Sequence, residues 1–291
     1  MVIIGGTGRM GTWFARFFKN AGLNVTIAGR SQSKSSQIAA QLEVDATTLK
    51  DLDPKRYDLV FLSTPIRATA YMVRQLAKRM AEGATIAEIA SIKGEIGQAL
   101  AEAHRKYGIK AVSLHPMFGP GAENIKGQKI IVIPVENCED AARTMNNFLK
   151  EAGAVTLWLK SFEEHDRFMA LVLALPRLIN TIFAEALKTS HVPLLKIVEF
   201  GGTTFRFQKI VCQSIFQEEA EMYAAIQALN PEFSKIVAEI EKLVKQLKKT
   251  VKSGDIAYLK RLHRQASRYL SRDPEYPEAY KKFYLALKAM G

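Results

Sequence analysis

Short apolar runs alternate with amphipathic segments over the first 159 residues, and this rhythm restricts the fold more than any other property of the sequence. The apolar runs are rich in β-branched residues and are bounded by Gly, Pro or Asp, which is typical of buried strands. The intervening segments have helical periodicity. Such alternation favours parallel strands joined by crossover helices, so the sequence predicts a doubly wound α/β sheet, Rossmann-like in plan. The predicted strands are 2–4, 24–28, 58–63, 85–89, 111–114 and 130–134, and the predicted helices are 12–21, 33–41, 68–81, 96–107 and 138–152.

The periodicity changes after residue 159. From Glu163 onward the sequence shows helical periodicity almost alone. We therefore expect an α/β domain over residues 1–159 and an all-helical domain over residues 160–291. One helical face of the second domain is apolar, which suits a core or a dimer interface better than a ligand site. Its members are Ile236, Ile240, Leu243, Leu247 and Val251.

The composition of the 291 residues is that of a soluble globular protein. The start of the sequence lacks the features of a secretory signal, and no apolar run approaches the roughly 18–20 residues that cross a bilayer. Cys138 and Cys212 lie far apart and lack metal-ligand spacing. We therefore expect a cytoplasmic protein with reduced thiols, no bound metal and no membrane partner.

The formal net charge is +12, with basic residues gathered in the C-terminal third. Aromatic residues that could stack on bases do not alternate with them, so no nucleic-acid partner is expected. A solvated helix face accounts for the charge. A positive potential that steers anionic ligands toward the protein is the alternative.

A glycine motif, Gly6-x-Gly8-x-x-Gly11, follows the first predicted strand and opens the first helix. Glycines at this spacing permit a tight turn, a close approach of the backbone to a pyrophosphate, and close packing of helix on strand. The helix N-terminus then supplies free N–H groups. The motif predicts a dinucleotide site, and the residues expected to line it are Gly6, Thr7, Gly8, Arg9, Met10 and Gly11.

The end of the second strand indicates which dinucleotide binds. NAD-binding chains carry an acidic residue here for the ribose 2′-hydroxyl, whereas this chain has Arg30, followed by Ser31 and Lys34. A guanidinium can bind a 2′-phosphate through two hydrogen bonds, so we expect NADP in preference to NAD. Arg30 stacked on adenine or facing solvent is the alternative.

Polar residues also follow the later strands, where the carboxyl ends of a parallel sheet line a ligand crevice. Ser63, Thr64 and Pro65 are expected along the cofactor. Ser91 and Lys93 follow the next strand, and His115 ends the one after it. Hydride leaves a carbinol carbon only as its hydroxyl proton is taken up, and a neutral imidazole can accept that proton. A structural histidine is the alternative from spacing alone.

Several of these segments resemble the prephenate dehydrogenase family. The loop His115-Pro116-Met117-Phe118-Gly119-Pro120 is similar to the family's HPMxGP loop. Other similar segments are the cofactor loop Gly6–Phe14, the turn Ala90-Ser91-Ile92-Lys93, Glu164-His165-Asp166, Leu175-Pro176, and residues 217–226.

The resemblance implies an NAD(P)-dependent oxidative decarboxylation of prephenate to 4-hydroxyphenylpyruvate in tyrosine biosynthesis. It implies that His115 accepts the proton of the C4 hydroxyl and that Ser91 holds both groups. The rigid Pro/Gly loop would fix the imidazole in place. We expect a homodimer joined through the helical domains.

The chain departs from the family where the substrate carboxylates are bound. Arg177 stands where a histidine is common, and Ser214 stands where an arginine is common. Prephenate carries two carboxylates, so a cation is required. The residues expected to contact substrate are Lys93, Arg177, Arg206 and Ser214. For the segment His165-Asp166 we expect a helix cap and packing at the domain junction rather than catalysis.

Three alternatives remain open at this point. Arogenate dehydrogenase performs the same chemistry on a substrate with an amino group in place of the side-chain keto oxygen. A non-catalytic NADP-sensing or nucleic-acid-binding protein would use the basic C-terminal helices. A β-hydroxyacid or ketol-acid type reductase would share the two-domain plan, but the catalytic lysine or paired carboxylates of such enzymes are not evident in the sequence.

Overall fold

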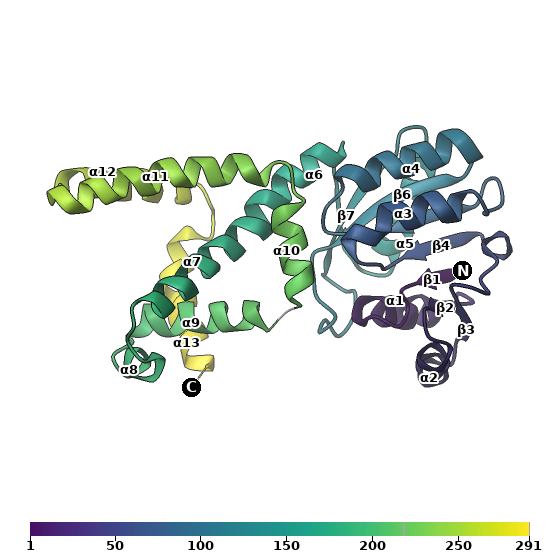
Figure 1. The fold of residues 1–291 in the computed structure, drawn as a ribbon, viewed down its shortest axis with the longest axis horizontal. Coiled ribbons are helices and arrows are strands. Elements are labelled where there is room, and N and C mark those ends of the chain that lie inside the picture. Colours follow the sequence, from purple (N-terminus) through teal and green to yellow (C-terminus); the bar gives the residue numbers. More distant parts are fainter. Residues whose placement is uncertain (218, 291) are drawn as a thin grey trace. The chain divides into compact units, whose positions relative to one another are not determined.

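The computed structural model describes residues 1–217 and 219–290, which fall into two compact units. Unit 1 comprises Met1–Leu173 and Glu221–Pro231, and unit 2 comprises Ala174–Ala220 and Glu232–Gly291 (Figure 1). The first division lies at residues 173 and 174, later than the boundary expected at 159 and 160. The reason is packing, because helix α6 (Phe162–Met169) lies on the sheet through Met169, which joins a small core with Ile131 and Ile133.

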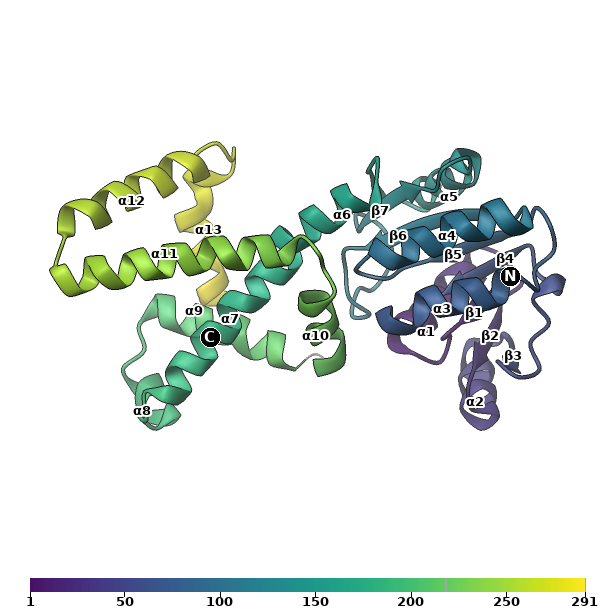
Figure 2. The same ribbon diagram turned by 45° about the horizontal axis from the view of Figure 1, so that its top comes forward.

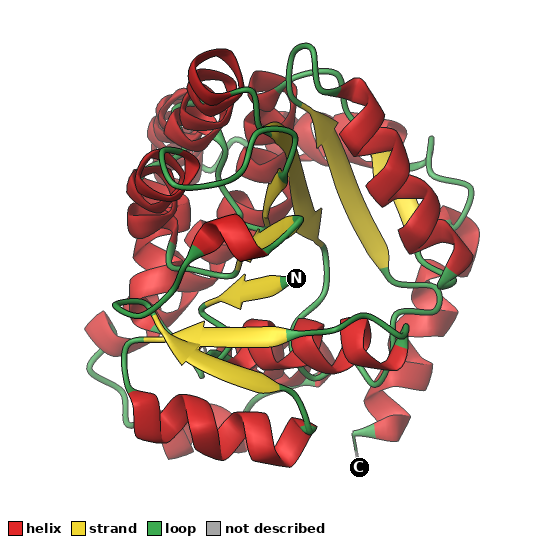
Figure 3. Ribbon diagram, turned by 90° about the vertical axis from the view of Figure 1, so that its right-hand side faces the viewer, coloured by secondary structure: helices red, strands yellow, loops and turns green. Residues whose placement is uncertain are grey.

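Unit 1 is built on one eight-stranded sheet with the strand order β3-β2-β1-β4-β5-β6-β7-β8. Figure 3 shows strands of this sheet in yellow. All neighbouring strands are parallel except β6 and β7. The order reverses direction at β1 and β4, as a doubly wound sheet requires, so the predicted fold class is confirmed. The strands are β1 (Val2–Ile4), β2 (Thr26–Gly29), β3 (Asp45–Thr48), β4 (Leu59–Leu62), β5 (Thr85–Glu88), β6 (Lys110–Pro116), β7 (Lys129–Pro134) and β8 (Val155–Trp158).

The sequence analysis predicted neither the antiparallel pairing of β6 with β7 nor the strands β3 and β8. Strands β6 and β7 are joined by a loop without a crossover helix, and a parallel return needs such a crossover. The loop therefore leaves and re-enters the sheet at the edge where β6 ends. Strand β3 lies at the sheet edge, and three of its four residues are polar, so the apolar pattern that marks buried strands is missing. Strand β8 is the opposite edge.

Helices cover both faces of the sheet, because strand residues alternate between two cores. On β4, Val60 and Leu62 face the core beneath α3 and α4, while Phe61 faces the core beneath α1, α2 and α5. Helices α3 and α4 lie side by side on one face (Figure 2). The helices are α1 (Arg9–Asn20), α2 (Gln32–Leu42), α3 (Ile66–Ala77), α4 (Gly94–Tyr107) and α5 (Glu139–Glu151).

Unit 2 is helical in its described residues. Helices α7 and α9 are joined through Asn180, which accepts a hydrogen bond from Gln208 at 2.9 Å. Helices α11 and α12 lie side by side as a hairpin, with Gly254 at a positive φ of 68° and Asp255 capping α12 through the Tyr258 N–H. The helices of unit 2 are α7 (Leu175–Thr189), α8 (Leu194–Glu199), α9 (Thr203–Phe216), α11 (Phe233–Ser253), α12 (Ile256–Leu270) and α13 (Ala279–Ala289). Helix α10 (Ala220–Ala228) belongs, apart from Ala220, to unit 1.

One continuous helical stretch, Phe162–Thr189, is long and apolar enough, by length and composition alone, to span a bilayer. The sequence reading found no such run, because Arg177 interrupts the apolar residues. A π-helical segment, Ala170–Ala174, joins α6 to α7 within this stretch. The first part of the stretch packs on the sheet through Met169 and carries the buried polar side chains of His165 and Asp166. Of the apolar window within this stretch, 22% is buried.

Candidate active site

The turn from β1 into α1 forms the cradle predicted from the glycine motif. Gly5 has a positive φ of 78°, and a Cβ there would overlap the Ser63 carbonyl of the neighbouring strand end. A Cβ on Gly6 would lie 2.6 Å from Ile27 Cβ, and one on Gly11 would overlap Gly5. Gly5, which precedes the predicted motif, is therefore the glycine of this turn that needs the left-handed conformation.

Gly8 differs from these glycines because its role is not packing. It is the exposed N-cap of α1, and the atom nearest to the place of a Cβ is the Gly5 carbonyl oxygen at 3.3 Å. A backbone that stays accessible at a helix N-terminus suits an approaching phosphate. The cradle thus fits the pyrophosphate of a dinucleotide, with Thr7 beside it and Arg9 and Met10 in the first turn of α1.

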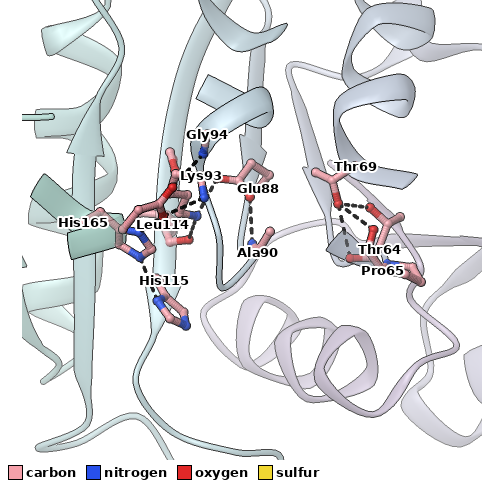
Figure 4. Close-up of polar contacts among 12 residues, drawn as sticks. Thr64, Pro65, Thr69, Glu88, Ala90, Lys93, Gly94, Leu114, His115 and His165 are labelled. Atoms are coloured by element: carbon pink, nitrogen blue, oxygen red, sulfur yellow. Dashed lines mark hydrogen bonds and ion pairs between the residues drawn. The ribbon is translucent and has the colours of Figure 1, made fainter. Parts of the chain in front are cut away.

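The end of β4 lies against this cradle. The Ser63 N–H donates to the Ile4 carbonyl at 2.8 Å. The Thr64 and Thr69 hydroxyls are 2.8 Å apart, and Pro65 caps α3, so the turn is held from within (Figure 4). Ser63, Thr64 and Pro65 therefore lie between β4 and α3, with Ser63 against the glycine cradle.

Of the residues expected at the ribose, Arg30 and Ser31 lie between β2 and α2, and Lys34 lies in the first turn of α2. Arg30 and Lys34 are exposed, so both cations are accessible to an anionic ligand. Ser31 caps α2, since its hydroxyl oxygen accepts the Lys34 N–H at 3.3 Å. The local geometry therefore gives Ser31 a structural duty in addition to any contact with cofactor.

A buried ion pair lies at the end of β5. The Lys93 ammonium donates to Glu88 Oε1 at 2.6 Å and to the Leu114 carbonyl at 2.7 Å, and the side chains of Lys93 and Glu88 are both fully buried. The second carboxylate oxygen accepts the Ala90 N–H at 2.7 Å, and the Ser113 hydroxyl also donates to Glu88. Burial lowers the pKa of Lys93, and the charge of Glu88 opposes this shift.

This network changes the interpretation of Lys93. Its ammonium donates to two protein oxygen atoms and has no exposed surface. The arrangement argues against the substrate contact expected from sequence, because a group buried behind the strand ends cannot reach a ligand without breaking an ion pair. Its role is to tie β5 to β6 beneath the turn that carries Ser91.

A chain of three polar side chains stands next to this network. His115, at the end of β6, has its Nδ1 atom 2.9 Å from His165 Nε2 (Figure 4). His165 Nδ1 lies 2.9 Å from Asp166 Oδ1. The Asp166 carboxylate also accepts the N–H groups of Lys93 at 2.9 Å and Gly94 at 3.0 Å. All three side chains are nearly or fully buried.

Burial determines the charge state of the two imidazoles. It lowers the pKa of His115 well below its ordinary value, and the positive charges that His165 and Lys93 can carry add to this effect. Burial also lowers the pKa of His165, although Asp166 opposes the shift. Both rings are therefore neutral near pH 7, and a neutral ring carries a lone pair that can accept a proton.

The predicted site residues divide between the two units. The cofactor residues, Ser91 and His115 lie at the carboxyl edge of the sheet in unit 1, with Ser91 half-buried in the turn before α4. Arg177 is nearly buried on α7, whereas Arg206 and Ser214 are exposed on α9, all three in unit 2. The Ser214 hydroxyl donates to the Val211 carbonyl of its own helix at 2.8 Å.

The sequence reading missed the roles of His165, Asp166 and Glu88. Asp166 does cap a helix, but the helix is α4, distant in sequence. Glu88 carried a signal, because an acidic residue that ends a buried strand needs a partner. No pattern in the sequence connects His165 to His115. Among the residues that the structure describes, no group of His, Cys, Asp and Glu side chains forms a metal site.

Comparison with protein families gives two matches that together span most of the chain. Residues 14–158 match the model of the prephenate dehydrogenase nucleotide-binding domain. Residues 161–265 match the model of the prephenate dehydrogenase dimerization domain.

Curated relatives carry related names. The chain is 30% identical over 92% of its length to a probable arogenate/prephenate dehydrogenase of Methanocaldococcus jannaschii, and spans 60% of that protein. It is 26% identical over 78% of its length to the T-protein of Haemophilus influenzae, and spans 55% of it. The chain thus covers a little over half the length of these relatives.

Solved structures share the fold. A prephenate dehydrogenase from Aquifex aeolicus superposes with a TM-score of 0.75 at 20% identity, covering 94% of this chain and 99% of that one. An arogenate dehydrogenase from Synechocystis gives a TM-score of 0.73 at 19% identity, covering 93% and 98%.

Proposed function

Because the chain belongs to the prephenate dehydrogenase family, we propose that it catalyses the NAD(P)-dependent oxidative decarboxylation of prephenate to 4-hydroxyphenylpyruvate. The observation that carries this proposal is the neutral, buried His115 at the edge of the sheet that also bears the glycine cradle. A proton acceptor and a site for a hydride acceptor at one sheet edge are the two requirements of alcohol oxidation.

The residues of this chain would divide the work as follows. A nicotinamide dinucleotide held by Gly8 and the first turn of α1 supplies the hydride acceptor. His115 takes the proton of the C4 hydroxyl on Nε2 as hydride leaves C4. Ser91 orients this hydroxyl. The bond to the ring carboxylate breaks and CO2 leaves. The released electron pair passes through the ring to the C4 oxygen, which regains a proton to give the phenol of 4-hydroxyphenylpyruvate. Because the ring becomes aromatic, alignment of the reacting groups is the main task of the protein.

The substrate anions need cationic partners. Arg177 and Arg206 in unit 2 are our candidates for the two carboxylates, and the positive net charge of +12 favours the approach of a dianion. Arogenate is the second candidate substrate, because the relative from Methanocaldococcus jannaschii is named for both compounds. The chemistry at His115 is the same for either.

For the cofactor we propose NADP in preference to NAD. The support is the pair of exposed cations, Arg30 and Lys34, that follow β2, in the region where NAD-binding chains have a carboxylate. A 2′-phosphate placed there would gain two charge-assisted contacts.

We also propose a homodimer formed through unit 2 in the cytoplasm. Support comes from the match of residues 161–265 to a dimerization domain. Large apolar side chains of the α11–α12 hairpin are exposed in the single chain, as an interface requires. They are Val237, Leu243, Val244, Val251, Ile256, Leu259, Tyr269 and Leu270.

The test is a steady-state assay with NAD and NADP, each against prephenate and arogenate. We expect turnover of at least one substrate, and a loss of roughly 10²-fold or more in kcat for His115→Asn with unchanged cofactor affinity. His191→Asn is the matched control, because His191 is exposed and has a positive φ of 58°, which asparagine tolerates. Cofactor binding without turnover of either substrate, or salt-dependent binding of nucleic acid in its place, would overturn the proposal.

A further inference from the structure

The hydrogen bonds around Asp166 determine which ring nitrogens carry protons. Its two carboxylate oxygens accept the N–H groups of Lys93 and Gly94, which open helix α4. A helix N-terminus favours the ionised carboxylate, and an ionised carboxylate can only accept hydrogen bonds. His165 Nδ1, 2.9 Å from Oδ1, must therefore be the donor.

The direction of the hydrogen bond from His165 to Asp166 determines the direction of the bond between His115 and His165. A neutral imidazole has one donor and one acceptor nitrogen, so a proton on His165 Nδ1 leaves Nε2 as the acceptor. His115 Nδ1, which faces His165 Nε2 at 2.9 Å, must then donate. The neutral His115 ring consequently keeps its lone pair on Nε2, the nitrogen on the side away from His165.

We propose that His165 and Asp166 are positioning residues that hold His115 in the tautomer whose Nε2 atom can accept a proton. The catalytic consequence rests on the function proposed above, because only an alcohol oxidation uses that lone pair. The tautomer itself follows from the protein alone. The opposite tautomer would present an N–H group to the substrate hydroxyl, and such a ring cannot take the proton.

The arrangement also restricts the motion of the His115 ring. His165 is fully buried, and the Asp166 carbonyl accepts a hydrogen bond from Asn230 Nδ2 at 2.8 Å, so helix α6 is tied to the segment Glu221–Pro231. When His115 gains a proton on Nε2, its Nδ1–H bond to His165 is unchanged. The new positive charge then faces a ring that Asp166 keeps in the accepting orientation.

If His165 served only to fill space, substitutions at this residue would have different effects from those expected for a positioning residue. Two variants of His165 can therefore distinguish the packing role from the positioning role. In His165→Gln the side-chain carbonyl oxygen can still accept a hydrogen bond from His115 Nδ1. In His165→Leu the volume is similar but the acceptor is lost. If His165 only fills space, the leucine variant is as active as the glutamine variant or more active, since burial then favours the apolar residue.

The experiment is ¹⁵N NMR of the histidine rings in the intact chain without cofactor or substrate. We expect His115 in the wild type to carry its proton on Nδ1, with Nε2 unprotonated. The glutamine variant should keep this state, and the leucine variant should show a mixture of both tautomers. A wild-type His115 protonated on Nε2, or a leucine variant with an unchanged tautomer, overturns the inference.

Kinetics give the second measurement. With the substrate found in the assay above, His165→Leu should lower kcat by between about 10²- and 10⁴-fold, with little change in the KM for cofactor, and His165→Gln should recover most of the loss. Equal activity of the two variants contradicts the positioning role. If no substrate is turned over but the NMR result is as expected, the proposed function fails while the assignment of the tautomer stands.

Discussion

Gly97 of α4 and Phe162 of α6 pack so closely that a Cβ atom on residue 97 would overlap the phenyl ring. This contact allows the two helices to approach each other. Asp166, one helical turn beyond Phe162, then reaches the first N–H groups of α4. The position of His165 beside His115 thus depends on the absence of a side chain at residue 97.

Gly97→Ala should destabilise the protein and lower its activity. Alanine gains about 1 kcal/mol in helix propensity, but overpacking costs about 1–3 kcal/mol, so the net effect is a loss. Urea unfolding measures the loss of stability, and kcat measures the loss of activity. The control is Gly94→Ala, where the new Cβ would lie 3.7 Å from Asp166 Oδ2, an ordinary contact. A Gly97→Ala protein as stable and active as the control would show that α6 adjusts freely.

Lys93→Met should lower the free energy of unfolding by about 3–5 kcal/mol. The substitution leaves the Glu88 carboxylate buried without its counter-ion, and both side chains of the pair are fully buried, so solvent does not screen the loss. Adding Glu88→Gln should restore part of the stability, because the remaining buried charge is removed. Denaturant unfolding measures each variant.

The control for this prediction is Lys19→Met, which breaks a pair with Glu43 that is largely solvent-exposed. It should change stability little. If Lys93→Met were as mild as this control, the Lys93 ammonium would not be required beneath the Ser91 turn, and a ligand contact for it would have to be reconsidered.

Stability should fall as the pH drops below about 6.5. The folded state lowers the pKa of His115 and His165 through burial, so below the unfolded value of about 6.5 the unfolded chain binds more protons than the native one. Each histidine then contributes a slope of up to about 1.4 kcal/mol per pH unit, and its stabilisation is fully present above that pH. Unfolding at pH 7.5, 6.5 and 5.5 measures the slope.

His115→Asn should reduce this pH dependence, whereas His191→Asn, which changes an exposed ring, should not. Activity should also fall as the pH is lowered, because His115 must be neutral to accept a proton. The acidic limb of kcat/KM should therefore lie below pH 6.5. An acidic limb above pH 6.5 would contradict this prediction, because burial and the nearby charges of His165 and Lys93 lower the pKa of His115.

Arg30→Gln should weaken the binding of NADP by roughly 10- to 100-fold and leave NAD binding almost unchanged. The estimate corresponds to the loss of a charge-assisted contact worth about 1.5–3 kcal/mol. Titration of both cofactors by fluorescence or calorimetry measures the two affinities. Lys78→Gln removes one positive charge from the exposed end of α3 and is the control for a general charge effect. Equal losses for NADP and NAD would refute a 2′-phosphate contact.

The glycine motif and the strand ends were readable in the sequence because each depends on local physics. Gly11 lies where the helix must approach the turn, and His115 closes a strand of buried residues. Parallel strands place their carboxyl ends at one edge whatever the details of the helices, so Ser91 and His115 could be assigned to a common edge. The sequence analysis assigned no role to Gly5, because only the tertiary structure shows its positive φ and its contact with Ser63.

Other features came from contacts between distant segments. Lys93 looks like a ligand-binding lysine in sequence, and only the fold shows that its ammonium points to Glu88 and the Leu114 carbonyl. Asp166 is a capping residue in both descriptions, yet the helix that it caps begins 72 residues earlier in the chain, at Gly94.

The amino-acid sequence by itself determined the doubly wound sheet, the glycine cradle and the imidazole at the sheet edge, since periodicity, turn residues and strand termini are properties of neighbours in the chain. The direction of the hydrogen bonds from Asp166 through His165 to His115 was decided only by the tertiary structure. The direction depends on which donor and acceptor groups are buried next to each other. The packing of α6 on α4 determines these neighbours, and no local sequence pattern does.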